Sequence, residues 1–180
     1  MPTPLRLLLP LALAACAACA ERGKPQVYDV APGAVPVEVA TFLDVRMGVG
    51  VAAPTVGWFQ RQVSLELARR GFDPRPLPLD QKPSGQGYAL DGRLYALPSL
   101  FEGGTDIGEV SFRARLTRDG RTVLEKNYQT RVWFGWHAMG EMATAESSTR
   151  EALAQALTDL GADLQGAVPA AAAAARGKRR

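Results

Sequence analysis

The chain has 180 residues, the size of about one domain. Its formal net charge is +3. Without Arg6 the net charge is +2, and without both Arg6 and the four basic residues of the end 176–180 it is −2. The body of the protein is therefore not a nucleic-acid-binding surface. The two cysteines are Cys16 and Cys19, which leaves the folded part without a disulfide, a thiol nucleophile or a cysteine metal site.

The N-terminus has the layout of a secretory signal. Arg6 precedes the apolar residues 7–12, and Leu13-Ala14-Ala15-Cys16 closes this run before the chain turns polar at Glu21. The run is too short to cross a bilayer as a helix, which needs about 20 residues. Leu-Ala-Ala-Cys resembles the lipobox of bacterial lipoproteins. In that family the preceding peptide is removed and the cysteine carries diacylglycerol.

The resemblance implies that Cys16 is the lipid acceptor and that the membrane is reached through this anchor. Cys19 is the alternative acceptor, although Cys16-Ala17-Ala18 lacks a leading aliphatic residue. An ordinary signal cut after Ala18 or Ala20 is the competing interpretation. By the sorting rule of the family, Ala17 after the cysteine implies the outer membrane, with the domain facing the periplasm.

The mature chain is expected to begin with a tether and to continue as one domain. Residues 1–15 form the signal peptide, 16–34 the lipidated N-terminus and tether, and 35–168 a single α+β domain. Residues 169–180 form an Ala-rich basic tail that is expected to be disordered.

Hydrophobic periodicity predicts the elements of the domain in chain order. Alternation over 35–42 indicates a strand, and an apolar stripe over 59–67 indicates a helix that ends at Gly71. The proline-rich residues 72–79 fit at most a short edge strand. Three further strands follow at about 88–97, 110–117 and 121–134, the last two joined by a hairpin turn at Asp119-Gly120.

A second amphipathic helix is predicted from about Met142 or Ser147 to Leu164. The order β-α-β-β-β-α indicates an α+β fold. We expect an antiparallel sheet of about four strands with both helices on one face. The opposite face would carry Arg113, Arg115 and Lys126 and would meet water or a partner.

The chemistry-bearing residues do not form a catalytic pattern, and we expect no enzyme activity. A hydrolase would need His137 with a serine such as Ser147 or Ser148, but no nucleophile-elbow motif surrounds either serine. His137 and Glu141 are spaced as two metal ligands on a helix, and no third ligand accompanies them. We predict no metal site and no cofactor besides the covalent lipid.

An aromatic and methionine cluster is the most unusual feature of the domain. It comprises Trp133, Phe134, Trp136 and Met139, and Trp58 is a further candidate at the start of the first helix. Such side chains at a strand-to-helix junction are candidates for contact with a lipid or a partner protein. The alternative is that they close the end of the core.

Short phrases along the domain resemble two groups of small proteobacterial envelope lipoproteins. The YajG-like lipoproteins are similar in Glu125-Lys126-Asn127-Tyr128 and in the closing residues 156–164. The PqiC-like auxiliary lipoproteins of ABC-type transporters are similar in the strand beginning Tyr88-Ala89-Leu90 and in the Asp-Gly hairpin. The first helix lacks a preceding Arg-Trp motif of the second group, and Gly57-Trp58 is the nearest match.

The resemblance implies a non-catalytic adaptor that is held to the outer membrane and assists envelope lipid transport or maintenance. Its partner would then be a component of an ABC-type lipid transporter. The first alternative is a lipid-binding module that holds an acyl chain between the helices and the sheet. A hydrolase built around His137 is the second.

Overall fold

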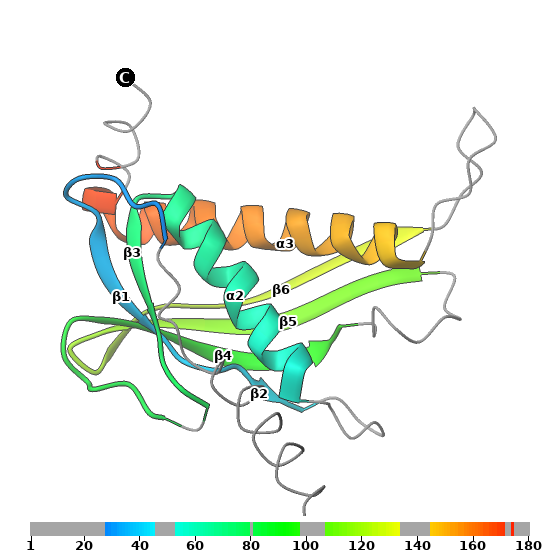
Figure 1. Cartoon of the computed structure of the whole chain (residues 1–180), viewed down its shortest axis with the longest axis horizontal. Helices are drawn as coiled ribbons and strands as arrows, with labels where there is room; N and C mark the ends of the chain where they lie inside the picture. The colour runs from blue at the N-terminus through cyan, green and yellow to red at the C-terminus, as the bar shows by residue number, and fades with distance from the viewer. Residues whose placement is uncertain are drawn as a thin grey trace, which may run out of the picture.

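The computed structural model describes residues 28–45, 53–79, 81–97, 107–133, 145–171 and 174. The chain follows the order β1 (Val35–Val39), β2 (Leu43–Asp44), α2 (Ala53–Arg69), β3 (Phe72–Pro76), β4 (Tyr88–Ala96), β5 (Ile107–Arg118), β6 (Arg121–Trp133) and α3 (Ala145–Ala167) (Figure 1).

The strands form one six-stranded sheet in the order β3-β1-β4-β5-β6, with β2 pairing beside β4. β1 runs parallel to β3 and β4, and β2 runs parallel to β4. β4, β5 and β6 are antiparallel neighbours. The α+β class is confirmed, while the expected antiparallel sheet of about four strands in the order β-α-β-β-β-α is corrected to a mixed sheet of six.

The position of α2 in the chain explains the parallel pairing. Because the helix carries the chain back across the sheet, β3 starts at the same end as β1, and Val35 stands opposite Phe72. β3 is the edge strand that the sequence predicts within 72–79. Pro74 and Pro76 suit this position because proline has no backbone N–H to donate, and one side of an edge strand has no neighbouring strand that needs a donor.

The helix α2 begins earlier than the apolar stripe over 59–67 indicates. It starts at Ala53, and Pro54 lies in its first turn. Backbone N–H groups of a first turn have no partner within the helix, so the proline is tolerated there. The helix ends at Arg69, and Gly71 adopts a φ of 87° that leads the chain into β3.

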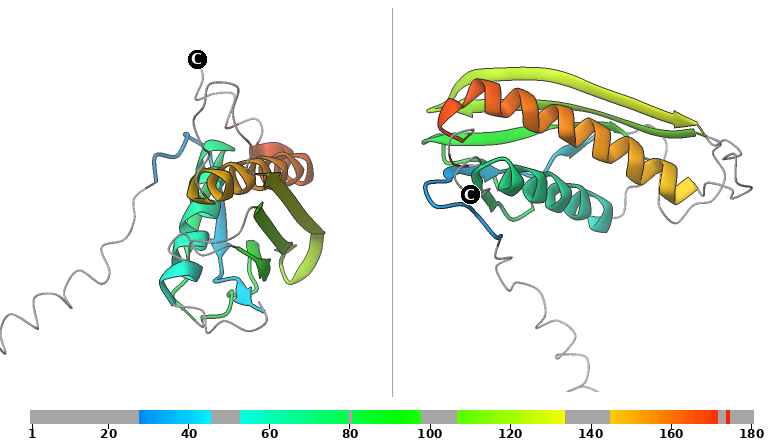
Figure 2. Two further views of the ribbon diagram at one scale, coloured as in Figure 1. Left: turned by 90° about the vertical axis from the view of Figure 1, so that its right-hand side faces the viewer. Right: turned by 90° about the horizontal axis from the view of Figure 1, so that it is seen from above.

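Both helices pack on one face of the sheet, as predicted. Figure 2 shows α3 running along β5 and β6, with α2 beside it. Aromatic rings fill the space between α2 and the sheet: the ring centre of Phe42 lies 5.1 Å from that of Phe59 and 6.0 Å from that of Phe112. Tyr128 stacks on Phe112 at 5.2 Å. Such pairs contribute about 0.5–1.5 kcal/mol beyond the burial of their area.

The predicted hairpin joins β5 to β6. Asp119 and Gly120 have φ angles of 51° and 76°, the left-handed values that a two-residue hairpin turn requires. A shift in register occurs between Leu116 and Thr117, next to this turn.

Packing extends beyond the predicted domain bounds of 35 and 168. Ala31 is buried before β1, and Ala171 is buried after α3 as part of the same hydrophobic core. Ala171, within the predicted tail, is thus packed against the domain.

Lys126, which the sequence predicts on the face of the sheet opposite the helices, lies on the helical face. The amino group of Lys126 lies 2.7 Å from the carboxylate of Asp163 in α3, so this side chain points toward the helical layer. Arg113 and Arg115 do lie on the open face, where they pair with Glu125 and Asp91. Lys126 stands near the sheet edge, which keeps its ion pair partly exposed.

Candidate functional site

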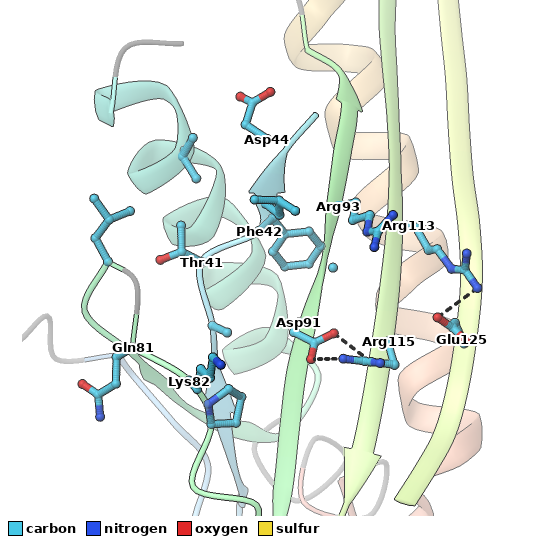
Figure 3. A pocket seen from close by; sticks show the side chains of 16 residues that line it. Thr41, Phe42, Asp44, Gln81, Lys82, Asp91, Arg93, Arg113, Arg115 and Glu125 are labelled. Carbon is cyan, nitrogen blue, oxygen red and sulfur yellow. Dashed lines mark hydrogen bonds and ion pairs between the residues drawn. The ribbon is translucent and has the colours of Figure 1, made fainter. Parts of the chain in front are cut away.

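The open face of the sheet carries a groove of about 710 Å³, called here the open-face groove (Figure 3). It lies where β1 gives way to β2, between β4, β5 and the loop that follows β3. The described residues that line it are Ala40, Thr41, Phe42, Leu43, Asp44, Val56, Leu79, Gln81, Lys82, Pro83, Asp91, Gly92, Arg93, Arg113, Arg115 and Glu125.

An interruption between two strands creates this hollow. The N–H of Ala40 donates to the carbonyl of Leu90 (2.9 Å) at the end of β1, and pairing with β4 resumes at Leu43 in β2. Between them Phe42 turns into the core and lies over Gly92. A Cβ at position 92 would overlap the Phe42 ring and the carbonyl oxygen of Arg113. The absence of a side chain at Gly92 therefore permits the turn that opens the groove.

The loop after β3 forms the second wall. The N–H of Leu77 donates to the carbonyl of Val39 (2.9 Å). The buried Gln60 amide donates to the carbonyl of Val39 at 2.8 Å and to that of Leu77 at 3.0 Å. The N–H of Ser84 donates to the carboxylate of Glu38 (2.7 Å). These bonds hold the loop on α2 and β1, so Leu79 and Lys82 stay beside the groove.

Ion pairs orient two arginines on the floor. Arg115 donates from Nε and Nη2 to the two carboxylate oxygens of Asp91, at 3.0 and 2.8 Å. This hydrogen bonding and the charge of Asp91 raise the pKa of Arg115 above its ordinary value. Arg113 reaches Glu125 at 3.0 Å. The two guanidinium groups are therefore held in place by acids on neighbouring strands.

Arg93 differs from these two arginines. It stands directly opposite Arg113 in the pairing of β4 with β5, and Figure 3 shows both side chains on the open face. Among the described residues no acid pairs with Arg93. The groove thus presents an exposed guanidinium group beside a second one.

Two exposed apolar side chains lie at the open-face groove. Leu43 is 59% exposed and Leu79 is 58% exposed, and both line the groove. Large aliphatic side chains with this much exposure are informative when they cluster beside a hollow. The groove combines a cationic floor with an apolar rim, an arrangement that suits an amphiphilic anion rather than proton transfer or nucleophilic attack.

The predicted contact residues are brought together only in part. Trp58 is half-buried and lines a second groove of about 320 Å³ between α2 and α3, together with Arg150 and Leu153. Trp133 ends β6, but its side chain lies outside the described residues.

The remaining predicted residues, Phe134, Trp136, Met139, His137, Cys16 and Cys19, also lie outside the described residues. Within the described ranges no helix is long and apolar enough to cross a bilayer. In those same ranges, no three His, Cys, Asp or Glu side chains group as metal ligands.

Sequence reasoning missed the open-face groove. The alternation of Arg113 and Arg115 with apolar residues placed them on an exposed face, and Asp91 and Arg93 alternate with Leu90 and Leu94 in the same way. Nothing local showed that the segment 40–42 would leave the sheet. The position of Arg93 opposite Arg113 would have indicated the groove, but it can be recognised only when the strand register is known.

Comparison with known proteins gives distant structural likenesses. No family model matches the sequence, and no curated protein matches it. Protein XCC0632 from Xanthomonas campestris, described with the family DUF330, is similar at 15% identity and a TM-score of 0.48, over 79% of this chain and 94% of that one. A PelC dodecamer from Paraburkholderia phytofirmans is similar at 14% identity and a TM-score of 0.49, over 75% and 95%.

Lipoprotein GNA1162 from Neisseria meningitidis is similar at 13% identity and a TM-score of 0.43, over 73% of this chain and 99% of that one. Some of the similar structures are thus named as lipoproteins. At this distance no property of those proteins follows for this chain, and the YajG-like and PqiC-like resemblances stay predictions.

Proposed function

We propose that this protein is a lipoprotein of the outer membrane whose α+β domain faces the periplasm and acts as a non-catalytic accessory in envelope lipid transport or maintenance. The observation that carries the proposal is Leu13-Ala14-Ala15-Cys16 at the end of a short apolar run, followed by a polar tether. Several acyl chains on one cysteine, at about 0.8 kcal/mol per buried methylene, anchor a protein firmly.

The architecture of the domain supports an accessory role. The helices α2 and α3 cover one face of the sheet, and the other face bears oriented charges on β4, β5 and β6. A surface of fixed ion pairs and one groove is suited to recognising a partner or a ligand. A component of an ABC-type lipid transporter is the partner that the sequence resemblance implies.

Lipid binding is the second candidate function. The sequence predicts an acyl chain between the helices and the sheet, whereas the structure favours the open-face groove. The rings of Phe42, Phe59 and Phe112 occupy the space between α2 and the sheet, where an acyl chain was expected to lie. Exposed Leu43 and Leu79 instead favour the open-face groove.

Purification from the native envelope in a mild uncharged detergent tests the accessory role. Mass spectrometry of the co-purifying proteins is expected to find a permease or substrate-binding component of a lipid transporter with the wild-type protein. Cys16→Ala should lose this component because the domain is no longer held at the membrane, while Cys19→Ala should retain it. Recovery of the wild-type protein alone contradicts the proposal.

A further inference from the structure

We propose that the open-face groove binds the phosphodiester of an anionic phospholipid headgroup, with Arg93 and Arg113 as its cationic contacts and Leu43 and Leu79 against the adjoining apolar part. This deepens the proposed role in lipid transport and rests on it for the source of the ligand. The geometry of the groove itself belongs to the folded domain and stands whether or not a transporter is the partner.

Arg93 and Arg113 stand directly opposite each other in the pairing of β4 with β5. Like charges directly opposite each other on antiparallel strands repel, and no acid among the described residues pairs with Arg93. An anion placed between the two guanidinium groups removes this repulsion. Planar guanidinium groups also match the oxygen geometry of a phosphate and bind it through parallel N–H···O bonds.

Arg113 and Arg115 on the floor of the groove keep N–H donors that their ion pairs do not use. Arg113 forms an ion pair with Glu125 through Nη2, and Arg115 uses Nε and Nη2 for Asp91. A guanidinium group carries five N–H donors, so each arginine retains donors after its ion pair is made. The acids therefore orient the floor without occupying all of its hydrogen-bonding capacity.

The charge of the lining favours a monoanion. Among the described residues, four cations line the groove, Lys82, Arg93, Arg113 and Arg115, against three acids, Asp44, Asp91 and Glu125. These described residues carry one excess positive charge, which a phosphodiester with a single negative charge neutralises. A dianionic phosphate monoester would leave an excess negative charge beside Asp91 and Glu125.

The size and the rim favour a lipid over a soluble phosphate. A volume of about 710 Å³ lies within the range of sites for small organic ligands and exceeds what a phosphate needs. Leu43 pairs in register with Arg93, so an exposed aliphatic side chain stands directly beside the cation. A glycerol backbone and the first methylenes of an acyl chain would cover Leu43 and Leu79 while the phosphate meets the arginines.

Calorimetric titration of the mature lipidated protein in dodecyl maltoside micelles tests this inference, with empty micelles as the blank. The probes are dihexanoyl phosphatidylglycerol, dihexanoyl phosphatidylcholine and glycerol 3-phosphate. We expect the phosphatidylglycerol to bind at least tenfold more tightly than the other two. Equal binding of glycerol 3-phosphate would assign the groove to soluble phosphates, and equal binding of the phosphatidylcholine would show that net charge does not select the ligand. Either result overturns the proposal.

Variants locate the binding. Arg93→Gln is expected to weaken binding of dihexanoyl phosphatidylglycerol about tenfold, and Leu79→Ser several-fold, because each removes one half of the amphiphilic contact. The matched controls are Arg61→Gln on the exposed side of α2 and Val123→Ser on β6, which should bind as the wild type does. Thermal unfolding confirms that each variant is folded. Wild-type affinity in Arg93→Gln would overturn the assignment.

The two proposals fail separately. Selective lipid binding together with an envelope purification that recovers no transporter component would retain the groove and remove the transporter role. A recovered transporter component with no lipid binding would do the opposite.

Discussion

Arg93 of β4 stands directly opposite Arg113 of β5 on the open face of the sheet, and only Arg113 has an acidic partner there among the described residues. Opposed like charges on antiparallel strands oppose folding, while opposite charges at such positions contribute about 0.2–1 kcal/mol. This arrangement is understandable if the position serves binding, since binding sites commonly retain features that lower stability.

Replacing Arg93 should therefore not destabilise the free protein. We expect Arg93→Gln to raise the free energy of unfolding by about 0.2–1 kcal/mol at low salt, because the repulsion with Arg113 is removed. The gain should shrink at high ionic strength, where exposed charges are screened. Urea unfolding at two salt concentrations measures both effects. Arg115→Gln is the matched control and should lower stability, because it removes the contact with Asp91.

A side chain at Gly92 should damage the fold where the open-face groove begins. A Cβ there overlaps the Phe42 ring and a backbone carbonyl that cannot move aside easily. We expect Gly92→Ala to cost about 1–3 kcal/mol, as overpacking does. Gly57→Ala is the matched control: nothing lies near its added Cβ, and it should stabilise α2 by about 0.5–1 kcal/mol. Equal stability of the two variants in thermal unfolding would be incompatible with this close packing.

The carboxylate of Asp163 links α3 to β6 through two donors. Lys126 donates to it at 2.7 Å and the Tyr128 hydroxyl at 2.9 Å. Asp163→Ala leaves the hydroxyl of the buried residue Tyr128 without this acceptor, and we expect the free energy of unfolding to fall by about 1–3 kcal/mol. Asp163→Asn keeps an oxygen acceptor and removes mainly the partly exposed ion pair, so its loss should be about 1 kcal/mol or less. Unfolding measurements at neutral pH compare the two variants.

The same carboxylate should contribute to acid unfolding. The hydrogen bond from Lys126 lowers the pKa of Asp163, and burial opposes it to a smaller extent. A carboxyl group with a lowered pKa in the folded state stabilises the protein above its ordinary pKa of about 3.9. This stabilisation disappears as the pH falls through the lower pKa of the folded state. The stability difference between wild type and Asp163→Asn should therefore narrow in acid; a constant difference from pH 7 down to pH 2 would contradict this role.

The elements with strong periodicity could be predicted from the sequence. The four-three-four spacing of Leu153, Leu157, Leu160 and Leu164 gave α3, and all four side chains are buried. Asp119-Gly120 marked the hairpin because few residue pairs adopt two left-handed φ angles in succession. These signals are local, and each depends on only a few neighbouring residues.

The parallel part of the sheet and the open-face groove could not be predicted in the same way. Which strand pairs with β1 depends on segments far apart in the chain, and the alternation within 35–42 does not specify a partner. The two-residue β2 is too short for a periodic signal. The turn of Phe42 over Gly92 and the exposure of Leu79 arise from tertiary packing.

The non-catalytic role makes a prediction for the one histidine of the chain. His137→Ala should leave the cellular function of the protein unchanged, because no step of the proposed role uses proton transfer or a nucleophile. Complementation of a deletion strain, scored by resistance to detergent and bile salts, measures this. Cys16→Ala serves as the positive control for loss of function. A loss with His137→Ala in a stably folded protein would instead favour the hydrolase alternative.

The intact mass of the mature protein isolated from its native membrane tests the lipid anchor on Cys16. We expect a chain that begins at Cys16 and carries the added mass of a diacylglyceryl group and an amide-linked acyl chain, with Cys19 unmodified. A chain of unmodified mass that begins after Ala18 or Ala20 would show that Cys16 carries no lipid, and a lipid on Cys19 would move the anchor to the alternative acceptor.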